Sequence, residues 1–454
     1  MLRLRDFLKE HKALLVAIII IALPAIGEMS LNSFLGLCDT LMISHLIGSE
    51  ALAAVGFANQ IIFTLIFIFS SFNTGATAMI ARAFGEKDYP KLNKIAGETV
   101  FINIIIGIII TILSWVFAKK IFGIFDMTDE VLNLSLTYFY VILFGMIFMF
   151  LSFSYAAILR GAGDTFTPMI ITGIVNILNI IGNYLLITGA GPFPKLGIVG
   201  AAWSTSVSRM IATIIYTYIL FIKSGPLRIK VRNMKVTKEV LKPLFKISLP
   251  GGGEQALIQI SFLIIGVIIS QLDTDSEAAF RILMNIESIS FMPAVGLSIA
   301  ATTLVGKALG ERDIKKAINT GYAAAGLGVL WGIFMGLIFF ILPKQLLGIF
   351  TSEANIILLS LTTMYFMGIN QPSLNFMIVM SGALRGAGDT FSVMVITALR
   401  LWVTFIPLSY IFIIVLKQGV IGMWYGEIIS FLIFNIIMFM RFKSKKWVNI
   451  KIDS

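Results

Sequence analysis

Long apolar stretches recur from one end of this 454-residue chain to the other, and they constrain its fold more than any other feature. A helix needs about 20 residues to cross a bilayer, so these stretches are long enough for helices and too long for barrel strands. We therefore predict an all-α integral membrane protein. Its twelve transmembrane helices are expected at about 13–45, 52–81, 97–118, 131–159, 166–189, 197–222, 247–271, 278–306, 317–342, 355–384, 391–415 and 419–440.

The composition agrees with a membrane protein. Hydrophobic residues make up 58% of the chain and charged residues only 13%, whereas a soluble domain carries about a quarter charged residues. The net charge of +11 alone would be compatible with nucleic-acid binding, but the basic residues lie in short segments between apolar stretches. We expect the protein to contact the lipid bilayer, to bind no nucleic acid and to be a monomer.

The basic residues also indicate the orientation. Of the 35 Lys and Arg residues, 27 fall at the two ends and in alternate connecting segments, and 5 fall on the opposite side. Because cytoplasmic segments are enriched in Lys and Arg, both termini are predicted to be cytoplasmic. The apolar stretch near the N-terminus has no small-residue cleavage site, so we read it as a retained first helix. The expected location is the cell (inner, cytoplasmic) membrane, crossed many times.

Three segments recur at offsets of 225 or 226 residues, which indicates a duplication. They are LPAIGEMSL with LPGGGEQAL (23–31 and 249–257), ARAFGEKD with GKALGERD (81–88 and 306–313), and LRGAGDTF with its identical copy (159–166 and 384–391).

Six helices in each copy give two parallel repeats around a central cavity, which rocking could open to either side. The predicted domains are an N-lobe at 1–222, a cytoplasmic linker at 223–246, and a C-lobe at 247–454 with a basic tail.

Local chemistry explains parts of the repeated segments. In RGAGDT the glycines permit a tight turn, and Asp164 or Thr165 can cap the following helix. Pro24 and Pro250 lie inside apolar stretches, where each removes a backbone hydrogen bond and bends its helix. Each bend is either a hinge or a packing feature.

Two polar stripes run along predicted helices. Their members are Glu28, Asn32, Gly36 and Asp39 in the first helix, and Thr172, Asn176, Asn179 and Asn183 in the fifth. Spacings of three and four place each set on one helix face, which should meet a partner helix or water.

A charge at mid-membrane costs roughly 2.5–3.5 kcal/mol, so an acid inside a membrane helix is a candidate for function. Asp39 is the leading candidate, as a group that binds a cation and couples its entry to a change of conformation. The alternative is a structural hydrogen bond between helices.

Several segments together resemble the multidrug and toxic compound extrusion (MATE) family, over nearly the whole chain. They are CDTLMISHLIGSEALAAVG (38–56), the GEKD and GERD turns, both LRGAGDT copies, and FMPAVGLSIAATTLVGKALGERD (291–313). The LPGGGEQ segment is most similar to the prokaryotic DinF-like branch. The resemblance implies a multidrug efflux antiporter that exports amphipathic, often cationic compounds by alternating access. It implies no cofactor beyond a coupling ion, H⁺ or Na⁺.

The resemblance also assigns cation-coupling residues. Asp39 matches the family's first-helix aspartate, and Asn179 matches the asparagine of its N-x-x-x-D-x-x-L-I pattern, here NIIGNYLLI. The aspartate of that pattern is Asn183 in this chain. Tyr138 matches a tyrosine of the same cluster, and Thr205 is a further contributor. Proton coupling through Asp39 is preferred, with Na⁺ at Asp39, Asn179 and Asn183 as the alternative.

Further charges lie in predicted helices. Glu28 and Glu254 occupy equivalent places in the two repeats, and Glu287, Arg400 and Glu427 are additional buried-charge candidates. Each of them serves either packing, including an Arg–Glu pair, or transport.

Other function classes find less support in the sequence. A flippase for a lipid-linked precursor would need several cations in its cavity, and Arg209 and Arg400 are the few available. An enzyme is not expected, because His11, His45 and Cys38 are too few for a metal centre and no catalytic dyad stands out.

Overall fold

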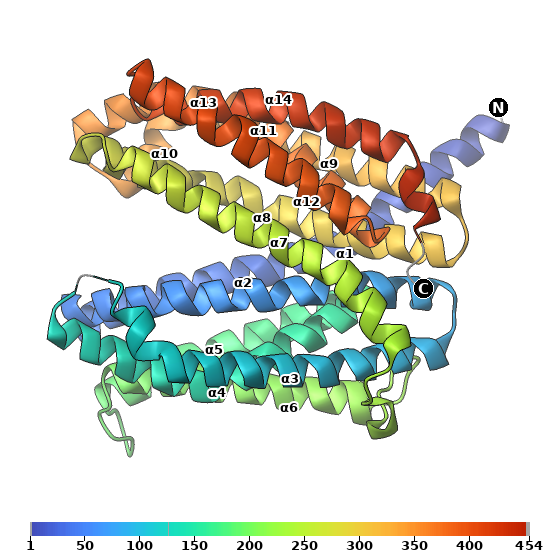
Figure 1. Cartoon of the computed structure of the whole chain (residues 1–454), viewed down its shortest axis with the longest axis horizontal. Coiled ribbons are helices and arrows are strands. Elements are labelled where there is room, and N and C mark those ends of the chain that lie inside the picture. The colour runs from blue at the N-terminus through green and yellow to red at the C-terminus, as the bar shows by residue number, and fades with distance from the viewer. Residues whose placement is uncertain (1, 126, 451–454) are drawn as a thin grey trace. The chain divides into compact units, whose positions relative to one another are not determined.

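The computed structural model describes residues 2–125 and 127–450, and every regular element in these ranges is helical (Figure 1). The helices form two compact units. The first unit comprises Gly27–Ser248, and the second comprises residues 2–26 together with 249–450. The second unit therefore includes residues 2–26, and the first unit includes the linker expected at 223–246.

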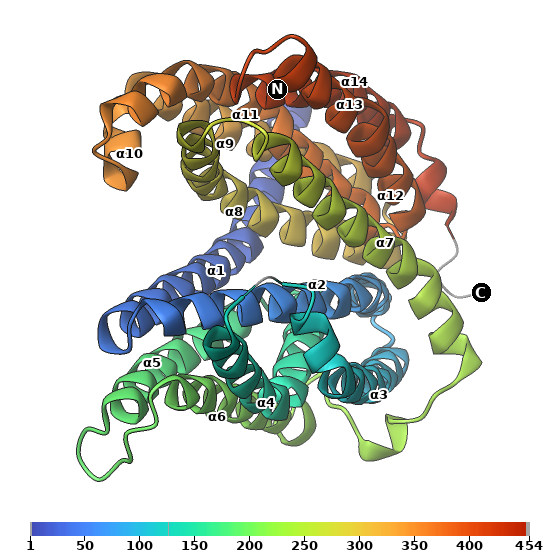
Figure 2. The same cartoon turned by 60° about the vertical axis from the view of Figure 1, so that its left-hand side comes forward.

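In the first unit, one helix lies at the centre of a bundle. The helices after α1 (Leu2–Leu46) are α2 (Ser49–Gly85), α3 (Tyr89–Phe122), α4 (Asp129–Gly161), α5 (Phe166–Thr188) and α6 (Ile198–Thr217). A π-helical turn at Tyr218–Ile222 extends α6. The central helix α4 packs against α2, α3 and α6, and α5 packs against α6 (Figure 2).

The second unit repeats this arrangement. Its helices after α7 (Lys238–Ile269) are α8 (Thr274–Gly310), α9 (Ile314–Ile341), α10 (Pro343–Phe350), α11 (Ala354–Gly386), α12 (Thr390–Leu399), α13 (Ile406–Tyr410) and α14 (Ile421–Lys443). Here α11 takes the place of α4, because it packs against α8, α9 and α14. The predicted duplication is thus confirmed. The short helix α10 was not predicted.

One predicted span is not a uniform helix. Between α12 and α14 the chain forms π-helical turns at Arg400–Phe405 and Ile411–Val415, on either side of α13. Pro407 in α13 has no backbone N–H, so the regular pattern of hydrogen bonds cannot continue through it.

A side-chain contact between helices is also duplicated. Thr77 Oγ1 in α2 lies 3.2 Å from the carbonyl of Ala157 in α4. Thr302 Oγ1 in α8 lies 2.8 Å from the carbonyl of Gly382 in α11, and both residues are 225 positions later. The crossing of the two helices is therefore the same in both units.

The outer faces of the helices are apolar, as lipid contact requires. Trp115, Leu330 and Val403 are each 62% exposed, and soluble monomers rarely present large continuous apolar patches. Among the described residues, eleven helices are long and apolar enough to cross a membrane. The twelfth long helix, α11, is less apolar because Asn370 and Gln371 interrupt it. The chain is a multi-pass membrane protein.

The two RGAGDT copies share a turn but use their aspartates differently. Gly163 has φ +92°, so the predicted tight turn does require glycine. Asp164 Oδ1 accepts a hydrogen bond of 2.9 Å from the backbone N–H of Thr167, which confirms the aspartate as the cap of α5. In the second copy, Asp389 instead accepts 2.7 Å from Arg441 Nε.

Two helices run from one unit into the other. These are α1 (Leu2–Leu46) and α7 (Lys238–Ile269), and each passes the boundary within two residues of its proline, Pro24 or Pro250. Proline weakens a helix at that point, since it removes a hydrogen bond.

Candidate functional site

The polar stripe of α5 faces the interior of the first unit. Thr172, Asn176, Asn179 and Asn183 are all buried, with exposures between 0% and 7%. Asn176 Nδ2 donates a 2.7 Å hydrogen bond to the carbonyl of Leu31 in α1. The prediction that this stripe meets a partner helix rather than lipid is confirmed.

Asp39 in α1 joins this stripe. Its Oδ1 accepts a 2.6 Å hydrogen bond from Nδ2 of Asn183. The amide of Asn179 fits its neighbours best with Nδ2 3.0 Å from the same Asp39 oxygen and with Oδ1 accepting from Thr205 N and Oγ1, at 3.2 and 3.1 Å. Helices α1, α5 and α6 thus meet at one carboxylate.

The surroundings of this cluster are fixed by further contacts. Ser204 Oγ donates to the carbonyl of Asn179 at 2.8 Å, and Ser206 Oγ donates to the carbonyl of Val141 at 3.2 Å. Tyr138 in α4 is 6% exposed and lies within electrostatic range of Asp39. The structure therefore brings together all five residues predicted for cation coupling.

One polar atom of the cluster has no partner. Asn183 is fully buried, and its Oδ1 finds no hydrogen-bond donor within the described residues. A buried acceptor without a donor is unfavourable by about 1–3 kcal/mol. This oxygen is therefore ready to accept from a protonated carboxyl or to bind a cation.

A small cavity lies along the same face of α1, between α1, α4, α5 and α6. Its volume is about 20 Å³, enough for one water molecule, and Glu28, Asn32 and Arg209 are among its lining residues. Asp39 is not part of its wall. However, Arg209 interacts electrostatically with both Asp39 and Glu28, so one cation influences both carboxylates.

Glu28 and Glu254 each form an ion pair with an arginine of the repeated loops. Arg160 Nη1 lies 2.9 Å from Glu28 Oε1, and Arg385 Nη2 lies 2.6 Å from Glu254 Oε1. Thr397 Oγ1 adds a 3.3 Å bond to the same oxygen of Glu254. Of the two predicted roles, these pairs favour packing.

The other predicted buried-charge residues, Glu287, Arg400 and Glu427, lie in the second unit. Gln371 Nε2 donates to Glu287 Oε1 at 3.1 Å, and Asn370 Nδ2 donates to Glu427 Oε2 at 2.9 Å. The two carboxylates interact electrostatically with each other.

Arg400 belongs to the same group of charges. It interacts electrostatically with Glu427 and lies over the ring of Phe431, 4.2 Å from its centroid. A cation over an aromatic face is attracted by the ring quadrupole.

Sequence reasoning missed the arginine partners, Arg160 and Arg385. The signal was present, because each is the second residue of an LRGAGDTF copy and the two are 225 apart, nearly the offset of Glu28 and Glu254. A repeated acid and a repeated base at one offset indicate a duplicated ion pair.

The family model described as MatE matches two segments, residues 24–185 and 250–411. The chain belongs to the MatE family. The two matched segments are 226 residues apart, which is the offset of the internal repeat, so each half of this family member carries one copy of the conserved domain.

Two relatives align over almost the whole chain. The probable multidrug resistance protein NorM of Thermotoga maritima is 32% identical over 428 residues, covering 94% of this chain and 92% of the relative. The uncharacterized transporter YisQ of Bacillus subtilis is 28% identical over 432 residues, covering 94% and 93%.

Solved structures of the family have the same fold. An outward-facing multidrug resistance MATE family transporter superposes with TM-score 0.89 at 23% identity, covering 96% of this chain and 97% of that chain. A transporter of the MOP superfamily from Pyrococcus furiosus superposes with TM-score 0.88 at 24% identity, covering 95% and 96%. This MatE protein therefore has the family's all-α fold of two repeated halves.

Proposed function

We propose that this MatE protein is a cation-coupled multidrug efflux antiporter of the cytoplasmic membrane, and that a proton on Asp39 couples ion entry to export. Relatives named as multidrug resistance proteins support multidrug export. The expected cargo is amphipathic, often cationic small molecules. One observation supports the coupling role most directly. Asp39 Oδ1 accepts a hydrogen bond from the amide of Asn183 in α5, and the oxygen of that amide has no donor within the described residues.

Protonation would change the hydrogen bonds between three helices. The ionised carboxylate of Asp39 accepts from the amides of Asn183 and Asn179. A protonated carboxyl becomes a donor, and Asn183, which already contacts Asp39, has an unused acceptor in its Oδ1. Rotation of this amide would replace one set of bonds by another, which is the kind of local change that shifts a two-state equilibrium.

The asparagine at position 183 sets the charge of the site. Asp39 is the only carboxylate among the five residues of the cluster, since Asn179, Asn183, Thr205 and Tyr138 are uncharged near neutral pH. One positive charge neutralises the site, so we expect one proton to be exchanged at Asp39 in each cycle.

Sodium is the alternative coupling ion. The unpartnered Oδ1 of Asn183 supports it, because hard cations prefer oxygen ligands such as carboxylate, amide and hydroxyl groups. Asp39, Asn179, Asn183 and Thr205 could supply such a set from α1, α5 and α6.

Transport in proteoliposomes tests the proposal. Purified protein is reconstituted with ethidium as a fluorescent amphipathic cation, and either a proton or a sodium gradient is imposed at fixed membrane potential. We expect the proton gradient alone to drive ethidium movement, and Asp39→Asn to reduce the rate at least about tenfold, since the uncharged amide cannot exchange a proton.

Asp275→Asn is the matched control, because Asp275 is an exposed acid in the other unit. It should transport like the wild type, and both variants should elute as the wild type on gel filtration. Full transport by folded Asp39→Asn would remove Asp39 from the mechanism, and dependence on sodium at constant pH would replace the proton by sodium.

A further inference from the structure

A pocket of about 680 Å³ lies in the first unit between the N-terminal turns of α3 and the segment that joins α6 to α7. Its lining is strongly basic: five side chains are cationic, namely Lys94, Arg228, Lys230, Arg232 and Lys235. The one lining carboxylate is Glu98. The polar cluster around Asp39 shares no residue with this pocket.

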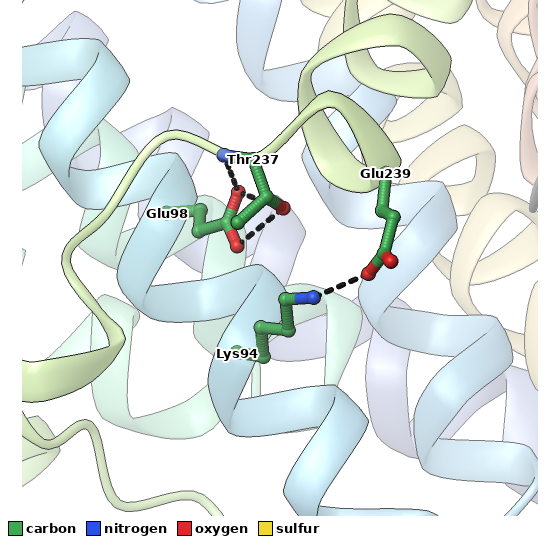
Figure 3. Close-up of polar contacts among 4 residues, drawn as sticks. All are labelled: Lys94, Glu98, Thr237 and Glu239. Carbon is green, nitrogen blue, oxygen red and sulfur yellow. Dashed lines mark hydrogen bonds and ion pairs between the residues drawn. The ribbon is translucent and has the colours of Figure 1, made fainter.

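The lining carboxylate forms its hydrogen bonds with a threonine and offsets only part of the charge of the five cations. Glu98 is 1% exposed and accepts from Thr237, whose N–H lies 2.8 Å from Oε2 and whose hydroxyl lies 2.8 Å from Oε1 (Figure 3). Lys94 is paired with Glu239 in the same view. Within the described chain, Lys230, Arg232 and Lys235 form no ion pair, so the pocket keeps a positive charge.

The basic segment is held in a defined position rather than left free. Arg228 N donates to Asn93 Oδ1 at 2.7 Å, and Asn93 Nδ2 donates to the carbonyl of Pro226 at 3.0 Å. The segment also approaches α3 closely at Gly97, where a Cβ would lie only 2.8 Å from Cβ of Asn233. The role of these basic residues in setting the orientation of the helices does not explain this anchoring. Orientation depends only on how many basic residues lie near a helix end.

Exposed apolar and aromatic side chains lie in sequence among the basic residues of the pocket. Val231 is 75% exposed and Val236 is 45% exposed, and Tyr89, which lines the pocket, is 40% exposed. Cations next to exposed valine and tyrosine suit the boundary between lipid headgroups and acyl chains. The positive-inside bias places this end of the helices on the cytoplasmic side, where anionic lipids are attracted to basic segments.

The geometry points to a binding site for a phosphate-bearing anion, with an anionic phospholipid headgroup as the expected source. Lys230, Arg232 and Lys235 supply the charge, and Asn93 and Glu98 position the segment that carries them. Because α3 and α7 both begin at this pocket, the occupant joins the linker to the helix bundle and stabilises the first unit.

Calorimetric titration of the full-length protein in non-ionic detergent tests the site, and it needs no transport. The probes are dioctanoyl-phosphatidylglycerol, dioctanoyl-phosphatidylcholine and inorganic phosphate. We expect phosphatidylglycerol to bind and phosphatidylcholine not to bind. If inorganic phosphate binds as tightly and competes, the source is free phosphate and the anion site stands.

The variant Lys230→Gln/Arg232→Gln/Lys235→Gln should weaken phosphatidylglycerol binding roughly a hundredfold, since each basic residue near the headgroups raises affinity severalfold. The matched control removes three charges from the exposed basic tail instead, as Lys443→Gln/Lys445→Gln/Lys446→Gln. It should bind as the wild type does.

A third variant, Asn93→Ala, changes no charge but removes the anchor of Arg228. It should weaken phosphatidylglycerol binding severalfold. If binding depended only on the net charge of the protein, this variant would bind as the wild type does. The proposal is overturned if the wild type binds neither anion, if the tail variant loses as much affinity as the pocket variant, or if folded Asn93→Ala binds normally.

Discussion

Arg160 Nη1 lies 2.9 and 3.0 Å from the two carboxylate oxygens of Glu28, and this contact joins the last turn of α4 to the interior of α1. The equivalent pair in the second unit, Arg385 with Glu254, is 2.6 Å long. Duplication has therefore preserved an ion pair that neutralises an acid inside each apolar bundle. An unpaired charge in this position would be strongly unfavourable.

Removing one partner of this ion pair should destabilise the fold. We expect Arg160→Leu to lower the free energy of unfolding by about 3 kcal/mol, because the buried Glu28 loses its ion-pair partner. The double variant Glu28→Leu/Arg160→Leu should recover most of this loss. Denaturation in mixed micelles measures both values. The exposed pair Lys316–Glu311 is the control, and Lys316→Leu should cost below about 1 kcal/mol. Equal losses in single and double variants would contradict the assignment.

Restoring an aspartate at position 183 should change how transport depends on pH. Asn183 Nδ2 is 2.6 Å from Asp39, so Asn183→Asp would place two carboxylates in contact, and they would have to share a proton. We expect two coupled ionisations whose apparent pKa values are pushed apart, seen as a shallower dependence of ethidium transport on pH. Asn183→Ser, which adds no charge, is the comparison and should keep the wild-type steepness. The same steepness in Asn183→Asp would indicate that this position does not communicate with Asp39.

Close helix packing should make one glycine of the repeated loop irreplaceable. A Cβ at Gly161 would lie 2.9 Å from the carbonyl oxygen of Thr77 and 3.0 Å from Ile80, so Gly161→Ala should separate α4 from α2. Overpacking of this kind costs about 1–3 kcal/mol. Gly56 in α2 is the control, because nothing lies within 4 Å of the added methyl group. Gly56→Ala should therefore be neutral or stabilising by up to about 1 kcal/mol. Thermal unfolding in detergent distinguishes the two, and equal midpoints would contradict close packing.

The helices and the duplication could be predicted from the sequence because both depend on local patterns. Apolar length determines where a chain can cross lipid, and segments such as LRGAGDTF recur without change. The spacing of polar residues predicted that the stripes of the first and fifth helices each meet a partner helix or water. The grouping of Asp39 with Asn179 and Asn183 came from the family resemblance.

The contacts that sequence reasoning missed depend on tertiary packing. Arg228 reaches Asn93 across 135 residues, and Thr237 reaches Glu98 across 139. Nothing in the local pattern of a basic linker indicates that it folds back on a particular helix. Its basic residues would mark the cytoplasmic side equally well if the linker were fully solvated. The short helix α10 was missed for a related reason, since eight residues are too few for a reliable periodic signal.

Neutralising Glu427, the acid of the second unit that interacts with Arg400, should leave proton coupling intact. Glu427 accepts a 2.9 Å hydrogen bond from Asn370 Nδ2, and the amide oxygen of Glu427→Gln can accept the same bond. If the proton is exchanged at Asp39, this variant should keep proton-driven ethidium transport within about twofold of the wild type. Its thermal stability should change little, since an amide is less costly to bury than a charge. Glu287→Gln, whose partner is Gln371, is the matched comparison. Loss of transport in folded Glu427→Gln alone would place part of the coupling in the second unit.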